Sequence, residues 1–245
     1  MKAAVVYGIN DLRLEEIEKP QIERDDQILV KIKAVGICGS DIHILHGANP
    51  FATYPRIMGH EMVGEVEAVG DNVKNIAIGD HIVVEPITYC GKCYACRKGM
   101  PNVCQQLKVS GVHVDGGMRE YIIIAEKQAH KIKKDIPWTT AVLAEPYTIA
   151  GNVTTRTNIS AGDKVVIQSA GPIGITILRM TKVKGATVLV TDMVDEKLAF
   201  AKENGADMVV NPSKENLIEA VKTWTDEEMA NVVIDAACTP KTFEI

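Results

Sequence analysis

The feature that most constrains the fold is an alternation of short apolar runs and helical stretches that begins near Asp163. Apolar runs of this length, bounded by turn residues, are typical of strands buried on both faces. Strands that alternate with helices form βαβ units around a parallel sheet. The expected strands are 164–167, 187–192, 208–210 and 231–235, and the expected helices are 173–184, 195–204 and 215–223.

The first of these strands runs into a glycine turn, Ser169-Ala-Gly-Pro-Ile-Gly174. It matches the dinucleotide fingerprint G-x-G-x-x-G, with serine in place of the first glycine. Gly171 would let the backbone approach a pyrophosphate, and Gly174 would let the helix pack on the strand. The phosphates would face the start of the helix. The expected cofactor contacts in this turn are Ser169, Gly171, Pro172, Ile173 and Gly174.

Asp192 ends the second strand, at the spacing expected for the acidic residue of the fingerprint. Its carboxylate would bind the adenosine ribose hydroxyls and repel a 2′-phosphate, which favours NAD over NADP. The alternative is that Asp192 only ends a strand at the surface.

The region from Met1 to about Asp135 has a different sequence pattern, with short strand-like runs and frequent glycine and proline. Several short strands at regular spacing predict a β-barrel or sandwich. A helical segment over 138–157 is expected to join this region to the parallel sheet. We therefore expect two domains, 1–145 and 146–245, with strands in the first at 1–7, 28–35, 62–69 and 81–84.

The chain ends at Ile245, shortly after the fourth strand expected in the parallel sheet. A doubly wound dinucleotide-binding sheet usually has about six strands. The second domain is therefore expected to be incomplete and the chain to be truncated at its C-terminus. Cys238 is expected to be a buried strand-end residue beside the cofactor cleft.

Four cysteines lie within one short segment, at positions 90, 93, 96 and 104. In a cytosolic chain such a cluster suggests a metal before a disulfide. Structural zinc takes four ligands tetrahedrally, and four thiolates are a common set. The ion would order a lobe of the chain and carry no chemistry, because no coordination position stays open. The expected ligands are Cys90, Cys93, Cys96 and Cys104; the alternative is four unrelated structural cysteines.

Further residues of metal-binding type are spread over three segments, Gly36–His43, Gly59-His60-Glu61 and Ala144-Glu145-Pro146. A catalytic zinc needs three protein ligands and one open position, and mixed nitrogen, sulfur and oxygen ligation fits Zn²⁺. Each signal is weak by itself, because a lone cysteine usually acts as a small hydrophobic residue. Together the three segments predict a catalytic zinc site.

In their order along the chain, these segments resemble the zinc-containing medium-chain dehydrogenase/reductase family, most closely its branch of sorbitol, L-idonate and galactonate dehydrogenases. The resemblance implies an N-terminal GroES-like β-barrel catalytic domain and a Rossmann domain that binds NAD. It also implies that Cys38 and His60 bind zinc and that Glu61 follows as a ligand. Glu145 would be a further ligand or would reach zinc through water.

The resemblance implies further roles near the two sites. Ser40 and His43 would carry protons, and Asp41 would orient the His60 ring, since histidine ligands usually need such a partner. Lys197 corresponds to a basic residue that the family often has near the cofactor; the alternative is a solvated side chain. The segments 111–117 and 145–150 resemble the sugar-acid members, and His113 either contacts the substrate or is a loop residue without such a contact.

The expected reaction is the reversible oxidation of a secondary alcohol of a polyol or sugar acid to a ketone, with hydride transfer to NAD⁺. Zinc would lower the pKa of the bound hydroxyl. The proton would leave through Ser40, the cofactor ribose and His43. The alternative is a catalytically incomplete fragment that binds zinc or nucleotide. A homo-oligomer is expected for a full-length relative and is left open for this chain.

Charge and composition exclude other classes of function. The formal net charge is −5 and no basic block stands out, so neither nucleic-acid binding nor membrane-surface binding is expected. No stretch approaches the roughly 20 apolar residues that span a bilayer, and the N-terminal apolar run is too short for a signal peptide. A cytoplasmic enzyme with a small-molecule substrate is expected.

Overall fold

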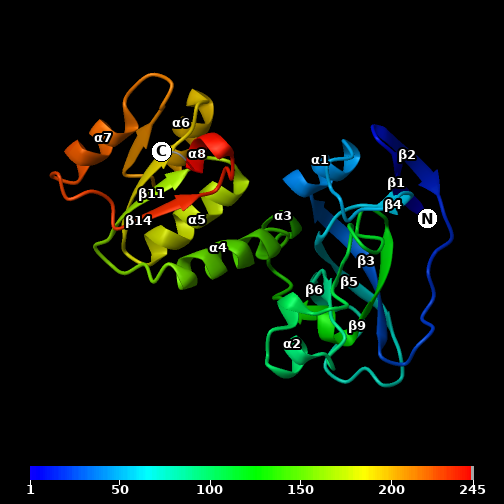
Figure 1. Cartoon of the computed structure of the whole chain (residues 1–245). Helices are drawn as coiled ribbons and strands as arrows, with labels where there is room; N and C mark the ends of the chain where they lie inside the picture. Colours follow the sequence, from blue (N-terminus) through cyan, green and yellow to red (C-terminus); the bar gives the residue numbers. More distant parts are fainter. Residues whose placement is uncertain (244–245) are drawn as a thin grey trace. The chain divides into compact units, whose positions relative to one another are not determined.

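The computed structural model describes residues 1–243. The chain forms two compact units, Met1–Glu145 and Pro146–Ile245. In Figure 1 the first unit runs from blue to green and the second from green to red. Each unit has its own buried core.

The N-terminal unit consists of antiparallel sheets. The largest has the strand order β10-β6-β5-β3-β9, and smaller sheets have the orders β2-β1-β4 and β7-β8. These pairings within residues 1–243 do not join the sheets into one closed barrel, so barrel closure stays a prediction. The strands are β1 (Lys2–Gly8), β2 (Asp11–Glu16), β3 (Gln27–Gly36), β4 (Arg56–Ile57), β5 (Glu61–Val69), β6 (His81–Val84), β7 (Ile87–Thr88), β8 (Lys108–Val109), β9 (Tyr121–Ala125) and β10 (Ala129–Lys131).

The pairing of β3 with β5 forms the centre of the five-stranded sheet. The buried faces of these strands carry Ile28, Val30, Met62 and Val66, which pack with Ile82 of β6. Alternate residues of a strand point to one face, so the partly alternating pattern of 28–35 fits a strand with one face in the core. β3 ends at Gly36 and leads through Ile37 and Cys38 into helix α1 (Gly39–Leu45).

Short helical turns lie between or after the remaining strands of this unit. They are α2 (Tyr94–Arg97), η1 (Pro101–Val103), η2 (Glu126–Gln128) and α3 (Trp138–Ala141). The helical segment expected over 138–157 is confirmed in its extent, but a turn at 142–143 divides it into α3 and α4 (Ala144–Arg156). The reason is Pro146, which has no backbone N–H and is tolerated only in the first turn of a helix. A new helix therefore begins shortly before it.

The C-terminal unit contains the predicted parallel sheet. Its strand order is β13-β12-β11-β14, and all of its pairs are parallel. The expected strands and helices of this unit are confirmed to within about two residues at their ends. They are β11 (Lys164–Gln168), α5 (Pro172–Val183), β12 (Thr187–Thr191), α6 (Asp195–Glu203), β13 (Met208–Val210), α7 (Leu217–Trp224) and β14 (Val232–Asp235), followed by α8 (Pro240–Phe243).

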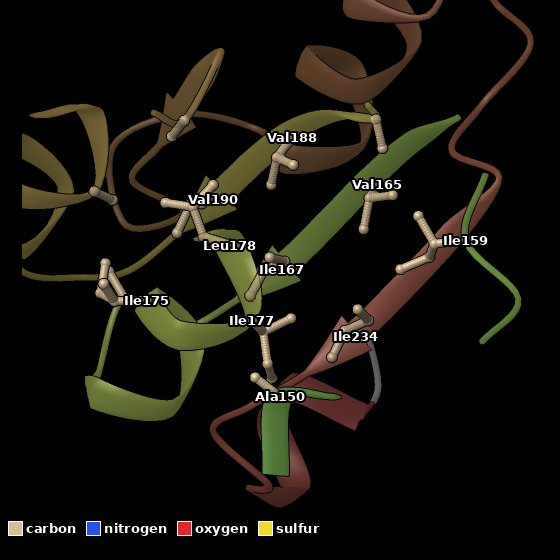
Figure 2. Close-up of a cluster of buried hydrophobic side chains, with 14 residues drawn as sticks. Ala150, Ile159, Val165, Ile167, Ile175, Ile177, Leu178, Val188, Val190 and Ile234 are labelled. Carbon is tan, nitrogen blue, oxygen red and sulfur yellow. The ribbon is translucent and has the colours of Figure 1, made fainter. Parts of the chain in front are cut away.

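Both faces of the parallel sheet are covered. Figure 2 shows one face, where Val165, Ile167, Val188, Val190 and Ile234 meet Ile177 and Leu178 of α5 and Ala150 of α4. The intervening strand residues Val166, Leu189 and Val210 face the other way and pack on Leu217 and Val221 of α7. This two-sided burial is why the strands are continuous apolar runs.

The prediction for Cys238 is wrong, because this residue is exposed. The Oδ1 oxygen of Asp235 accepts hydrogen bonds from the backbone N–H groups of Ala237 and Cys238, both at 2.9 Å. This tight turn after β14 places the thiol outside. Among residues 1–243, no helix has the length and apolar character needed to cross a membrane.

Candidate metal centres and cofactor turn

The first candidate metal centre lies where α1 and β5 begin. Cys38 is the N-cap residue of α1, His60 immediately precedes β5, and Glu61 is its first residue. One ligand atom from each of the three lies within 4.8 Å of the others. Zinc bonds of about 2.0–2.3 Å place tetrahedral ligand atoms about 3.3–3.8 Å apart. The three side chains therefore fit a zinc ion after a small closure.

Asp41 connects the two segments that carry these residues. Its Oδ2 accepts a hydrogen bond from the backbone N–H of Cys38 at 2.9 Å, and its Oδ1 accepts one from the N–H of Gly59 at 3.2 Å. Only 1% of the Asp41 surface is exposed. Asp41 Oδ1 lies 3.8 Å from Nδ1 of His60, which is longer than a hydrogen bond, and this buried nitrogen has no hydrogen-bond partner in residues 1–243. Asp41 therefore links the two backbones, and an orienting role toward the His60 ring stays a prediction.

Electrostatics at this centre favour a cation. The hydrogen bond between Cys38 and His60 raises the pKa of His60 to about 9 and lowers the pKa of the Cys38 thiol. Burial raises the pKa of Glu61, and burial also raises that of Glu145. A bound cation would favour the ionised form of all these acids and take the place of the proton on His60.

The remaining sequence-predicted residues of this centre lie around it. The pKa of the Cys38 thiol is lowered by His60 and, to a smaller extent, by the backbone N–H and the hydroxyl of Ser40. His43 is exposed on α1, three residues after Ser40 and on the same face of the helix. Glu145 is half-buried and close enough to interact electrostatically with His60 and Glu61, but it does not belong to the group of three converging ligand atoms. A role for Glu145 as a zinc ligand stays a prediction.

The second candidate metal centre is the four-cysteine cluster around α2. The sulfur atoms of Cys90, Cys93, Cys96 and Cys104 converge, with distances of 3.5 Å for Cys93–Cys96 and Cys90–Cys104, 3.9 Å for Cys93–Cys104 and 4.0 Å for Cys90–Cys96. A tetrahedral zinc ion with Zn–S bonds of about 2.3 Å requires sulfur atoms about 3.8 Å apart. The cluster therefore matches a closed structural site.

Backbone N–H groups already point at these sulfurs. The N–H of Cys93 donates to Cys90 and that of Gln106 donates to Cys104, both at 3.3 Å. Backbone hydrogen bonds from Cys96 and Gln105 lower the pKa of Cys93 to about 6, whereas burial raises that of Cys96 to about 12. Backbone hydrogen bonds from Lys92 and Cys93 also lower the pKa of Cys90. A bound cation would favour the thiolate form of these cysteines.

The cofactor turn lies between β11 and α5. Ser169 adopts φ 90°, a left-handed conformation that favours glycine, which explains why the fingerprint has glycine there. The Ser169 hydroxyl accepts a hydrogen bond from the N–H of Gly171 at 3.2 Å. A Cβ atom at Gly174 would lie 2.0 Å from the Ser169 carbonyl oxygen, so only glycine fits this close approach. Pro172 and Ile173 begin α5, whose N-terminus offers its free N–H groups to an anion.

Asp192 follows β12 beside this turn, and its Oδ2 accepts a hydrogen bond from the N–H of Ala170 at 2.9 Å. Lys197 is exposed on α6, and residues 1–243 provide no salt bridge for it. A contact between Lys197 and a cofactor stays a prediction.

A cavity of about 790 Å³ in the N-terminal unit was not predicted from the sequence. His113 lines it, and its ring lies 6.1 Å from that of Phe51 between centroids. His113 Nδ1 accepts the backbone N–H of Val109 at 3.1 Å, so the proton of the neutral ring is on Nε2. Lys108 and Thr53 also line the cavity. Apart from Cys90 of the four-cysteine cluster and His113 of the segment 111–117, the lining residues belong to no motif, and the folded loops bring them together.

The loop of His113 packs against the first metal centre. A Cβ atom at Gly111 would lie 2.8 Å from the backbone nitrogen of Gly59, and one at Gly116 would lie 2.2 Å from its carbonyl oxygen. The segment 111–117 therefore lies directly on the residue before His60.

Comparison with protein families gives two matches. Residues 24–134 match the alcohol dehydrogenase GroES-like domain, and residues 172–245 match the zinc-binding dehydrogenase family.

Individual relatives match nearly the whole chain. L-threonine 3-dehydrogenase of Pyrococcus abyssi is 38% identical over 248 residues, which are 100% of this chain and 70% of the relative. Sorbitol dehydrogenase of Bacillus subtilis is 33% identical over 249 residues, with the same coverage of 100% and 70%. Among solved structures, the short chain alcohol dehydrogenase (rspB) from E. coli CFT073, complexed with the cofactor NADH, has a TM-score of 0.90 and 42% identity, covering 98% of this chain and 70% of the other.

Proposed function

This chain belongs to the zinc-type medium-chain alcohol dehydrogenase family, and we propose that it transfers a hydride from a secondary alcohol of a polyol or sugar acid to NAD⁺. The observation that carries the proposal is the convergence of Cys38, His60 and Glu61 within 4.8 Å. When bound, zinc polarises the substrate hydroxyl and the nicotinamide accepts the hydride.

The chain's own residues hold the metal and move the proton. Cys38, His60 and Glu61 would bind the ion, and Asp41 keeps the first two segments in register. The Ser40 hydroxyl would accept the proton of the substrate hydroxyl while passing its own proton on toward His43. His43 is exposed on the same face of α1, where it would release that proton to water.

The four-cysteine cluster would hold a second, structural zinc. Its sulfur–sulfur distances of 3.5–4.0 Å support this assignment. Because the protein fills every coordination position, this ion would order residues 90–104 without binding substrate.

The cofactor would lie on the turn from Ser169 to Gly174. The left-handed Ser169, the close approach at Gly174 and the N-terminus of α5 all suit a pyrophosphate. The carboxylate of Asp192 supports NAD over NADP, because it would repel a 2′-phosphate.

The 790 Å³ cavity is lined by Phe51, Tyr89 and Leu107 as well as by polar side chains, and none of Cys38, His60 and Glu61 is among its lining residues. Thr53, Gln106, Lys108 and His113 offer hydrogen-bonding groups, and Lys108 adds a positive charge. The cavity therefore does not select the substrate class, and the proposal of a polyol rests on the similarity to sorbitol dehydrogenase of Bacillus subtilis.

A substrate panel tests this function. NADH or NADPH formation would be followed with polyols, sugar acids, L-threonine and primary alcohols, and zinc would be counted in the same samples. We expect the fastest turnover with NAD⁺ and a polyol or sugar acid. The proposal fails if primary alcohols outperform every polyol and sugar acid, and two zinc ions per chain without turnover would indicate a binding function only.

A further inference from the structure

Glu61 and Gly36 lie directly opposite each other on neighbouring strands. Gly36 is the last residue of β3 and Glu61 the first of β5, and the antiparallel register pairs them. Side chains at such paired positions normally meet, with their Cβ atoms about 4.5–5.5 Å apart. Here one partner has no side chain.

The Glu61 carboxylate occupies the space that a side chain at position 36 would take. A Cβ atom on Gly36 would lie 1.8 Å from Oε2 of Glu61, 2.9 Å from its Cδ and 3.0 Å from its Cβ. The first distance is far below any van der Waals contact. In this position the carboxylate belongs to the group of ligand atoms that lie within 4.8 Å of each other.

The backbone of Gly36 does not itself require glycine. Nine glycines of residues 1–243 have a positive φ, and Gly36 is not among them. An L-residue can therefore adopt this conformation, and what position 36 requires is the absence of a side chain.

We propose that Gly36 is a positioning residue for the metal centre. Because Gly36 has no side chain, the Glu61 carboxylate can occupy the space beside its Cα and lie among the metal ligands. The inference rests on the proposed function, since it treats Glu61 as a ligand. A methyl group at position 36 would fill this space. The carboxylate must then rotate away from Cys38 and His60, which costs the fold little because it is the end of a flexible side chain.

Gly36→Ala and Glu61→Ala, alone and combined, test this role in the full chain. Co²⁺ would be titrated into protein whose four-cysteine cluster holds zinc, with its visible absorption as the readout. Gly36→Ala should weaken Co²⁺ binding by about 10- to 100-fold, the range found for groups that orient metal ligands. Glu61→Ala should weaken it at least as much. In the double variant the methyl group meets no carboxylate and only the Cβ of residue 61, at 3.0 Å, so Gly36→Ala should add much less loss than it causes alone.

The control is Gly8→Ala, which adds a methyl group to another strand-end glycine that has no heavy atom within 4 Å of the new Cβ. It should leave Co²⁺ binding unchanged. Thermal unfolding of all variants would identify a loss of fold.

The proposal is overturned if Gly36→Ala binds Co²⁺ with unchanged affinity and spectrum, or if it weakens binding equally with and without Glu61. These readouts do not depend on turnover. If the Co²⁺ affinities of the variants follow the expected pattern but the wild-type protein oxidises no alcohol, the role of Gly36 stands and only the proposed function is contradicted.

Discussion

The side-chain oxygen Oδ2 of Asp192 accepts a hydrogen bond of 2.9 Å from the backbone N–H of Ala170. Its other oxygen, Oδ1, accepts one of 3.0 Å from the N–H of Val194. Asp192 therefore ties the end of β12 to the turn in which Ser169 has a left-handed backbone. The residue expected to bind the ribose also holds the turn expected to bind the phosphates.

Replacing Asp192 should separate these two roles. Asp192→Ala removes both acceptors, and the loss of one hydrogen bond to the turn should weaken NADH binding by about tenfold. Asp192→Asn keeps an acceptor oxygen and removes the charge, so it should improve NADPH binding while losing less NADH affinity than the alanine variant. Fluorescence titration with both cofactors measures this. Equal NADH affinity in the wild type and both variants would contradict it.

Asp41 should be essential for the first metal centre. Asp41→Ala leaves the buried N–H groups of Cys38 and Gly59 without their acceptor, at a cost of about 1–3 kcal/mol each. Asp41→Asn retains one oxygen acceptor, so its stability and zinc content should lie between those of the alanine variant and the wild type. Thermal unfolding and zinc content report the effect. An alanine variant with the stability and zinc content of the wild type would show that the two segments are held in another way.

The four-cysteine cluster should bind one zinc ion independently of the other centre. Cys93→Ser should lower the zinc content by about one ion per chain and expose residues 90–104 to proteolysis, because the metal orders this lobe. Cys238→Ser is the matched control, since Cys238 is exposed and outside the cluster. Equal zinc contents in the two variants would contradict a metal role for Cys93.

Zinc binding to Cys38 and His60 should weaken as the pH falls. Without metal, the hydrogen bond with Cys38 raises the pKa of His60 to about 9 and lowers that of Cys38. Below about 9, while Cys38 is a thiolate, zinc must displace one proton from His60. The apparent affinity should then fall about tenfold per pH unit. Competition with a chelator across this range measures it, and an affinity independent of pH would contradict it.

The parallel sheet is the part of the fold that the sequence predicts best. Val165, Ile167 and Val188 belong to apolar runs that are buried on both faces, and such runs identify strands without reference to their partners. The helix break before Pro146 also follows from a local rule, although the continuous pattern over 138–157 obscured it. β2 was not predicted, although Leu12 and Leu14 alternate with charged residues; both leucines are exposed, so the strand has no buried apolar face.

The candidate ligands could be predicted from residue types, but the contacts that position them could not. Asp41 was expected to orient the His60 ring, and its Oδ1 lies 3.8 Å from the ring nitrogen Nδ1, but its hydrogen bonds to the backbones of Cys38 and Gly59 were not predicted. The relation between Gly36 and Glu61 depends on strand register, and the cavity beside His113 depends on loop packing. Neither leaves a local pattern in the sequence.

The most direct test of the proposed hydride transfer is an isotope experiment. The polyol or sugar acid that turns over fastest would be deuterated at its secondary carbinol carbon and incubated with the full chain and NAD⁺. The reduced cofactor would then be analysed by mass spectrometry. We predict one deuterium in each NADH formed, and none formed by Cys38→Ser. NADH without deuterium, or no NADH from any polyol or sugar acid, would contradict the proposal.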